Sequence, residues 1–200
     1  MKRIALTLAA LTVLLAAAPA HAGDAMSASV RNCAWCHGTS AQGYTVAPRL
    51  AGQQARYLET QLYGFATHHR DNPASKQYMW NATAALKDST IRDLADYFAA
   101  LPPRPANDGH RDLAGRGQAI YSQGIPEANV AACLACHGPN AQGIRDIPRL
   151  GGLSYGYLKQ RLEQWNQGYH GAVPSPMPVV ARSLSPDEVE ALASYLSFVR

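Results

Sequence analysis

Apolar residues recur along this chain at helical rather than strand spacing. Apolar positions at i, i+4 and i+7 predict a helix over 55–65, and similar spacing predicts helices over 89–101 and 112–121. Residues 185–188, Ser-Pro-Asp-Glu, supply a capping residue, a proline at the first helical position and acids in the first turn. We expect a helix to begin there and to run to about residue 198. No segment alternates apolar and polar positions, so the pattern predicts an all-α fold.

The first 22 residues have the pattern of a secretory signal peptide. Lys2 and Arg3 precede an apolar run over 4–18, which Pro19 ends, and Ala-His-Ala at 20–22 fits a cleavage site. The run is shorter than the ~20 residues that a membrane-spanning helix needs, so an uncleaved membrane anchor is the weaker alternative. We expect cleavage after Ala22 and export to the periplasm.

The remaining chain is a tandem duplication. Shifting the sequence by 100 positions aligns Cys-x-x-Cys-His-Gly at 33–38 with the same motif at 133–138. The same shift aligns Pro-Arg-Leu-x-Gly at 48–52 with its copy at 148–152. A proline-rich linker over 101–109 separates the copies, which predicts an N-terminal domain over 23–105 and a C-terminal domain over 106–200. Domains of this size often need a cofactor or a metal to complete their core.

Composition narrows the function classes. Hydrophobic residues make up 47% of the chain, which favours packed domains over disorder. The net charge is +4, but two of those charges belong to Lys2 and Arg3, and no later Lys/Arg run suggests a nucleic-acid partner. Four cysteines are too few for a disulfide scaffold in a chain of this length.

All four cysteines fall in the two Cys-x-x-Cys-His motifs. Thiols three positions apart can form thioethers with the two vinyl groups of one haem, and the next residue brings an imidazole to the iron. We therefore predict two covalently bound haem c groups. The attachment residues are Cys33, Cys36, Cys133 and Cys136, and the iron ligands are His37 and His137.

Other uses of these cysteines fit less well. A zinc site would combine cysteine pairs from separate repeats and would give the histidines no role. A thioredoxin-like site needs a βαβ context, and simple disulfides with this spacing are usually redox-active.

Met79 and Met177 are the candidates for the second axial ligands. At a shift of 98 positions they align with each other, each in a predicted loop before the last helix of its domain. A thioether there would give His/Met ligation and raise the reduction potential, whereas an ordinary loop methionine would only fill the core. His68, His69 and His170 compete for this role, but none recurs in the other repeat.

Residues just after each motif are candidates for supporting roles. A haem-ligating histidine commonly donates its second N–H to a carbonyl, and the carbonyls of Pro48 and Pro148 are candidates. Arg49 and Arg149 would either pair with haem propionates or lie on a solvated surface. The chain before Cys33 is short, which predicts a shortened first helix in the N-terminal domain.

These motifs, together with Leu-Ala-x-Tyr on both final helices, resemble a class I cytochrome c in tandem, and more closely the dihaem cytochrome c4 family. The resemblance implies two small helical domains, each wrapping one covalently attached haem, with His37 and Met79 on one iron and His137 and Met177 on the other. It implies an electron carrier between respiratory donors and a terminal oxidase or another acceptor, and no catalysis.

The partners that the resemblance implies are redox proteins such as a cytochrome oxidase or a quinol-oxidising complex, with peripheral membrane association as an option. The alternative is a dihaem cytochrome subunit of a flavoprotein or quinoprotein dehydrogenase. A haem-based sensor ranks last because the sequence contains no recognisable output module.

Overall fold

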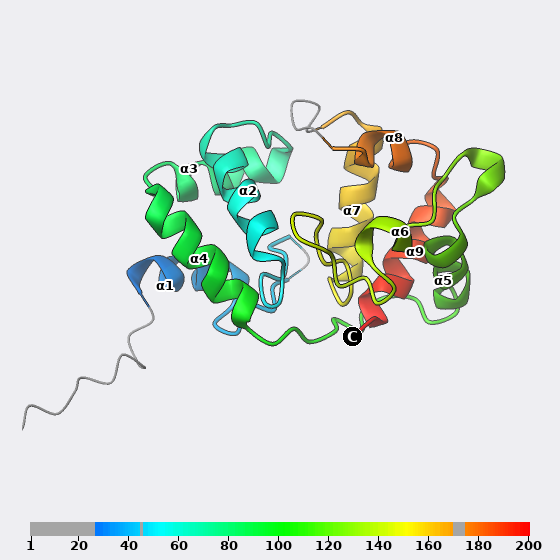
Figure 1. Ribbon diagram of the computed structural model, residues 1–200, viewed down its shortest axis with the longest axis horizontal. Helices are drawn as coiled ribbons and strands as arrows, with labels where there is room; N and C mark the ends of the chain where they lie inside the picture. Colours follow the sequence, from blue (N-terminus) through cyan, green and yellow to red (C-terminus); the bar gives the residue numbers. More distant parts are fainter. Residues whose placement is uncertain (1–26, 45, 170–174) are drawn as a thin grey trace, which may run out of the picture.

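The computed structural model of this chain describes residues 27–44, 46–169 and 175–200. Its helices form two groups that lie side by side, and we call these the N-terminal and C-terminal domains (Figure 1). The N-terminal domain contains α1 (Ala28–His37), α2 (Ala55–Ala66), the π-helix η1 (Ser75–Met79), α3 (Trp80–Thr83) and α4 (Asp88–Ala100). The C-terminal domain contains α5 (Ala114–Gln123), the 3-10 helix η2 (Pro126–Ala128), α6 (Leu134–His137), α7 (Tyr155–Asn166), α8 (Met177–Ala181) and α9 (Pro186–Phe198).

The predicted all-α fold is confirmed for the described residues. They contain two isolated β-bridges, Ile125–Val130 and Ile144–Ile147, and no longer strand. The helices predicted over 55–65 and 89–101 are present within one residue of the predicted ends. The helix predicted over 112–121 begins and ends two residues later, as α5. The predicted signal peptide lies outside the described residues.

The last helix of each domain carries much of the core. In α9 the side chains of Val189, Leu192 and Leu196 are buried on one face, and α4 buries Ile91 and Leu94 in the same way. Each such side chain contributes roughly 1.5–3 kcal/mol of hydrophobic stabilisation. The helical periodicity of these positions therefore corresponds to the faces that hold each domain together.

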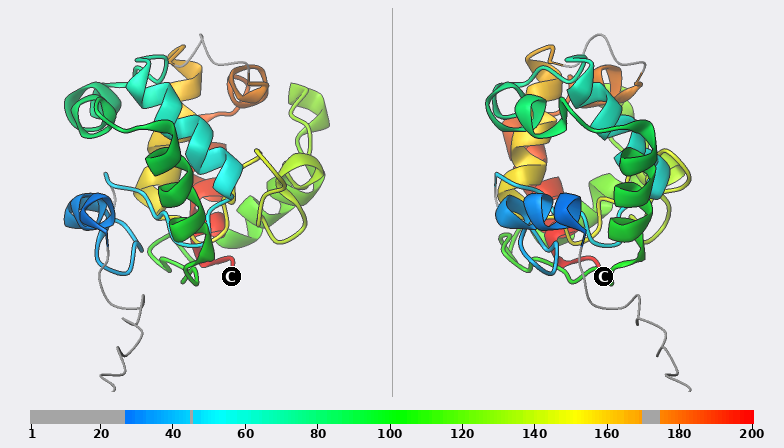
Figure 2. Two further views of the ribbon diagram at one scale, coloured as in Figure 1. Left: turned by 60° about the vertical axis from the view of Figure 1, so that its left-hand side comes forward. Right: turned by 90° about the vertical axis from the view of Figure 1, so that its left-hand side faces the viewer.

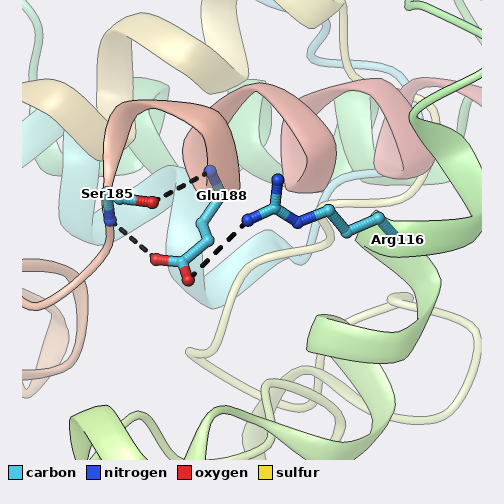
Figure 3. Close-up of polar contacts among 3 residues, drawn as sticks. All are labelled: Arg116, Ser185 and Glu188. Carbon is cyan, nitrogen blue, oxygen red and sulfur yellow. Dashed lines mark hydrogen bonds and ion pairs between the residues drawn. The ribbon is translucent and has the colours of Figure 1, made fainter.

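The start of α9 has the cap that its sequence predicts. The Ser185 hydroxyl accepts a hydrogen bond from the Glu188 backbone N–H, and the Glu188 carboxylate accepts one from the Ser185 N–H at 2.7 Å (Figure 3). This capping box satisfies two donors that the helix itself leaves unpaired. Arg116 of α5 lies 4.0 Å from the other carboxylate oxygen of Glu188, and this long ion pair with an exposed arginine contributes little energy.

The first helices of the two domains differ. In the C-terminal domain α5 packs closely on α9, and a Cβ atom on Gly117 would lie 2.0 Å from the Ala191 carbonyl oxygen. A glycine is therefore required where these helices approach each other. In the N-terminal domain α1 runs directly through the first cysteine motif, whereas η2 and its flanking loops separate α5 from α6. The shortening predicted for the first domain thus takes the form of one ten-residue helix that also carries the motif.

The linker over 101–109 contacts both domains. In its first half, the Pro102 carbonyl accepts a hydrogen bond from the Gln42 side-chain amide at 3.1 Å, and the Arg104 N–H donates to the Gln42 side-chain oxygen at 3.0 Å. Its second half lies against the C-terminal domain. The Ala106 N–H donates to the Gly152 carbonyl at 3.1 Å, and the Asn107 N–H donates to the Ser197 carbonyl at 3.0 Å. The Gly109 N–H donates to the Ser197 hydroxyl at 3.0 Å. The linker is therefore bound along its length as well as stiffened by proline.

The two domains also contact each other directly. When the N-terminal domain faces the viewer, the C-terminal domain lies behind it (Figure 2). The Gln53 side-chain amide donates to the Arg149 carbonyl at 2.9 Å, and its oxygen accepts from the Arg149 N–H at 2.7 Å. The Gln54 side chain donates to the Gln142 carbonyl at 2.8 Å. These bonds fix the start of α2 against the Pro-Arg-Leu segment and Gln142 of the other domain.

Candidate haem sites

The two cysteine motifs occupy equivalent positions in their domains. Cys33 and Cys36 lie one turn apart in α1, and Cys133 and Cys136 lie at the start and in the body of α6. In each pair the first cysteine is half-buried and the second is exposed, and none of the four forms a disulfide. Burial raises the pKa of the Cys33 thiol and raises the pKa of the Cys133 thiol to about 11. Each pair presents both sulfur atoms from one helical turn.

The following histidines are buried and oriented by carbonyl groups. His37 Nδ1 lies 2.7 Å from the Pro48 carbonyl oxygen, and His137 Nδ1 lies 2.9 Å from that of Pro148. A carbonyl can only accept, so Nδ1 carries the proton and Nε2 keeps its lone pair free for a metal. Burial lowers the pKa of both histidines, which keeps them neutral. The predicted contacts of the Pro48 and Pro148 carbonyls with these histidines are confirmed.

Short loops return the chain to each histidine. The Gly43 N–H donates to the His37 carbonyl at 2.9 Å, and the Leu50 N–H donates to the Ala41 carbonyl at 3.0 Å. The C-terminal domain has the equivalent two bonds. The Gly143 N–H donates to the His137 carbonyl at 2.9 Å, and the N–H of residue 150 donates to the carbonyl of residue 141 at 2.8 Å. The matched sequences after the motifs therefore fold into matched loops that place a proline carbonyl against each imidazole.

The prediction that both methionines lie in loops is wrong. Met79 ends the π-helix η1, and Met177 begins the short helix α8. Both side chains are half-buried, and Met177 packs against the same buried cluster as Cys133. The Met79 carbonyl accepts a hydrogen bond from the Thr83 hydroxyl at 2.8 Å. Single π-turns are frequent at functional sites, and one here places Met79 at an irregular point of the backbone.

Arg49 is not on a solvated surface. Its side chain is 5% exposed, and its Nε and Nη1 atoms are buried without a hydrogen-bond partner in the described chain. Burial lowers the pKa of Arg49 to about 10, and the charge of Arg149 adds to this effect. Arg149 is half-buried and donates from Nε to the Gly151 carbonyl at 3.0 Å. A buried guanidinium with unused donors fits a carboxylate-bearing cofactor such as haem.

The competing histidines have other contacts. His68 stacks on Trp80 with ring centroids 3.9 Å apart, and His69 Nδ1 lies 2.8 Å from the Thr67 hydroxyl. His170 lies outside the described residues. The two described histidines thus serve local packing and hydrogen bonding.

Sequence comparison of the repeats misses some of the residues that join the domains. Gln53 is buried and bonded across the interface, yet its aligned residue is Leu153, so no repeated signal points to it. Arg70 and Arg161 both lie at the interface and also come from unmatched positions. Tyr57 and Tyr157, which are half-buried there, are matched between the repeats. Gln142 and Arg149 are also matched, with Gln42 and Arg49, so a recurring signal exists at these interface positions.

Each domain thus supplies what a c-type haem requires, namely a thiol pair and a neutral imidazole with a free nitrogen. The N-terminal domain also supplies unpaired cationic donors.

The cytochrome c family model matches residues 21–102 and 114–199, one stretch in each domain. A thiosulfate dehydrogenase electron acceptor from Stutzerimonas stutzeri is 36% identical over 213 residues, covering 100% of this chain and 97% of the relative.

Solved structures of cytochrome c4 type are similar to this chain as well. A cytochrome c4 structure from Acidithiobacillus ferrooxidans is 36% identical, with a TM-score of 0.78 and coverage of 84% of this chain and 98% of that one. A thiosulfate dehydrogenase from Marichromatium purpuratum is 34% identical, with a TM-score of 0.73 and coverage of 82% of this chain and 36% of that one.

The chain belongs to the cytochrome c family. Within it, the tandem domains are those of a dihaem, cytochrome c4-like electron carrier with two covalently bound haem c groups. In the described part of the chain, no helix combines the length and the apolar character needed to cross a membrane.

Proposed function

We propose that Cys33 and Cys36 attach one haem and Cys133 and Cys136 attach the other. His37 and Met79 would ligate the N-terminal iron, and His137 and Met177 the C-terminal iron. The observation that carries this proposal is the pair of Nδ1 contacts to Pro48 and Pro148, which leaves Nε2 of each buried histidine free. Arg49 supplies unused donors suited to a propionate.

The bound haem groups supply one-electron chemistry, and the chain sets the conditions for it. The carbonyls of Pro48 and Pro148 hold the imidazole rings in one orientation. Burial keeps His37 and His137 neutral, and the buried clusters of each domain exclude water. An electron can then enter or leave with little rearrangement of the protein, because all the ligands are held by packed helices.

We propose a periplasmic carrier that takes electrons from respiratory donors and delivers them to a terminal oxidase or another acceptor. The likeness to a thiosulfate dehydrogenase electron acceptor and to part of a thiosulfate dehydrogenase supports a second candidate. In that case the chain receives electrons directly from a dehydrogenase, as its partner or subunit.

Ligation is tested by replacing each methionine in the haem-loaded protein. Met79→Ala and Met177→Ala should each remove half of the weak methionine-to-iron absorption band at the red end of the oxidised spectrum. They should also lower the reduction potential of one haem. Tyr78→Ala and Val179→Ala are controls, since these neighbours are 57% and 61% exposed. If both methionine variants keep the full band, the ligand assignment is wrong.

The partner is tested by rapid mixing. Reduced protein is mixed with membranes that contain a terminal oxidase, and oxidised protein is mixed with a thiosulfate dehydrogenase and its substrate. Fast oxidation in the first experiment supports the carrier, and fast reduction in the second supports the dehydrogenase partner. Export is tested by the mass of the periplasmic protein, which should begin at Gly23.

A further inference from the structure

Trp80 directly follows Met79 and is held at both of its N–H groups. It begins α3, and its backbone N–H donates to the Ser75 carbonyl, which closes the π-turn. Its indole N–H donates to the Arg70 carbonyl at 2.9 Å. The ring also stacks on His68, with ring centroids 3.9 Å apart and the two planes 15° from parallel. The residue after Met79 therefore has little freedom to move.

Thr83 holds the carbonyl group of Met79 itself. Its hydroxyl donates to the Met79 carbonyl at 2.8 Å and lies 3.3 Å from the Trp80 carbonyl oxygen. The Thr83 side chain is only 1% exposed, so water does not compete for this hydroxyl. Removing the acceptor would leave a buried donor unsatisfied, which makes the contact costly to break. The backbone of Met79 is thus fixed by side chains as well as by helical hydrogen bonds.

The segment that supplies these contacts is anchored to α2. The Arg70 N–H donates to the Gly64 carbonyl at 2.9 Å, and Arg70 Nη1 donates to the Gln61 side-chain oxygen at 2.7 Å. Closer to the methionine, the Ser75 hydroxyl donates to the Asn72 side-chain oxygen, and both side chains are buried. The carbonyl that accepts from the Trp80 indole therefore belongs to a fixed part of the domain.

The C-terminal domain lacks both side chains. At the shift that aligns Met79 with Met177, positions 178 and 181 hold a proline and an alanine in place of Trp80 and Thr83. Proline has no N–H, and neither side chain can donate a hydrogen bond. The side-chain contacts that fix Met79 therefore have no counterpart at Met177.

We propose that Trp80 and Thr83 are positioning residues for Met79, which hold its backbone in place for ligation of the N-terminal iron. The inference rests on the ligation proposed above. A ligand whose backbone is already fixed loses little conformational freedom when it binds, so an external ligand replaces it less readily. The same physics makes Met177, which lacks these contacts, the more easily displaced methionine.

The test is an imidazole titration of the oxidised, haem-loaded protein, followed by loss of the methionine-to-iron band. Imidazole replaces the thioether sulfur on the iron without any change of oxidation state. The background is Met177→His, which puts an imidazole in place of the C-terminal thioether, so that the remaining band reports Met79 alone. Trp80→Phe and Thr83→Val should each raise the imidazole affinity of the N-terminal haem roughly two- to tenfold, as one lost hydrogen bond predicts. Thr83→Ser keeps the hydroxyl and should keep the parent affinity.

Two controls separate positioning from a general loss of stability. Trp165→Phe removes an indole from α7 of the C-terminal domain and should leave the affinity unchanged. Urea unfolding gives the stability of every variant. A positioning role requires a larger rise in affinity for Trp80→Phe than for Trp165→Phe, even where the two lose similar stability. Thr83→Val serves as the test if Trp80→Phe does not fold.

The protein with both methionines supplies a further test. Half of its band should be lost at a lower imidazole concentration than the other half, and Met177→His should lack the half that is lost first. The proposal fails if the two halves are lost together or in the reverse order. It also fails if neither Trp80→Phe nor Thr83→Val raises the affinity more than Trp165→Phe, or if Thr83→Ser raises it as far as Thr83→Val. Absence of the band in Met177→His would instead contradict the proposed ligation of the N-terminal iron.

Discussion

Replacing Gln53 by leucine, the residue at the aligned position of the other repeat, should weaken the contact between the domains. The Gln53 side chain is 5% exposed and makes two hydrogen bonds to the backbone of Arg149, at 2.9 and 2.7 Å. Leucine has a similar volume but would leave the Arg149 N–H and carbonyl without these partners. Each unsatisfied buried group costs ~1–3 kcal/mol, and the lower end applies because Arg149 is half-buried. We expect a loss of about 2–3 kcal/mol for the two bonds together.

The assay is urea unfolding of the haem-loaded protein, followed separately by haem absorbance and by far-ultraviolet circular dichroism. Gln53→Leu should lower the midpoint and separate the two transitions as the domains unfold less cooperatively. Gln118→Leu makes the same chemical change on the exposed side of α5. Its free energy of unfolding should stay within about 0.5 kcal/mol of that of the parent protein. An unchanged midpoint for Gln53→Leu would refute the view that these bonds stabilise the interface.

Three other outcomes are expected. Gly152→Ala should destabilise the protein by more than ~1 kcal/mol in thermal unfolding. Residue 152 has φ +73°, and the added Cβ would lie 3.0 Å from the Val199 carbonyl oxygen. Ser185→Ala should cost about 1 kcal/mol in urea unfolding by removing the α9 cap, whereas Arg116→Ala should cost less than about 0.5 kcal/mol. Burial, and iron binding as proposed, both keep His37 and His137 unprotonated in the folded state, so the stability they contribute is complete above about pH 6.5 and is lost as the pH falls below that value. An acid titration that finds stability rising below pH 6 would contradict this sign.

Much of each domain follows from local sequence. Apolar spacing locates α2 and α4, and the cap residues locate the start of α9. The roles of Pro48 and Pro148 are also predictable, because a short loop after each motif returns the chain to the histidine in both repeats. These features depend on residues close in sequence, so the pattern alone contains the needed information.

Features that depend on the other domain do not follow from the pattern. The sequence leaves open whether Arg49 is buried or exposed, because the residues that cover it near Gly152 belong to the other domain. A local feature, the π-helix that ends at Met79, is also unpredictable, since its irregular hydrogen bonding is not a property of the apolar spacing. Arg70 and Arg161 meet from unmatched positions, so comparing the repeats hides their relation.

The bound linker changes how strong the domain interface needs to be. Because the first half of the linker binds Gln42 of the N-terminal domain and the second half binds the C-terminal domain, it holds the two domains at a high effective concentration, on the order of millimolar or above for a short tether. A handful of hydrogen bonds, such as those of Gln53 and Gln54, is then enough to keep the two halves docked. The same contacts between separate chains would give only weak association. Covalent tethering therefore delivers the two redox centres in fixed one-to-one stoichiometry, independent of how much protein the cell makes.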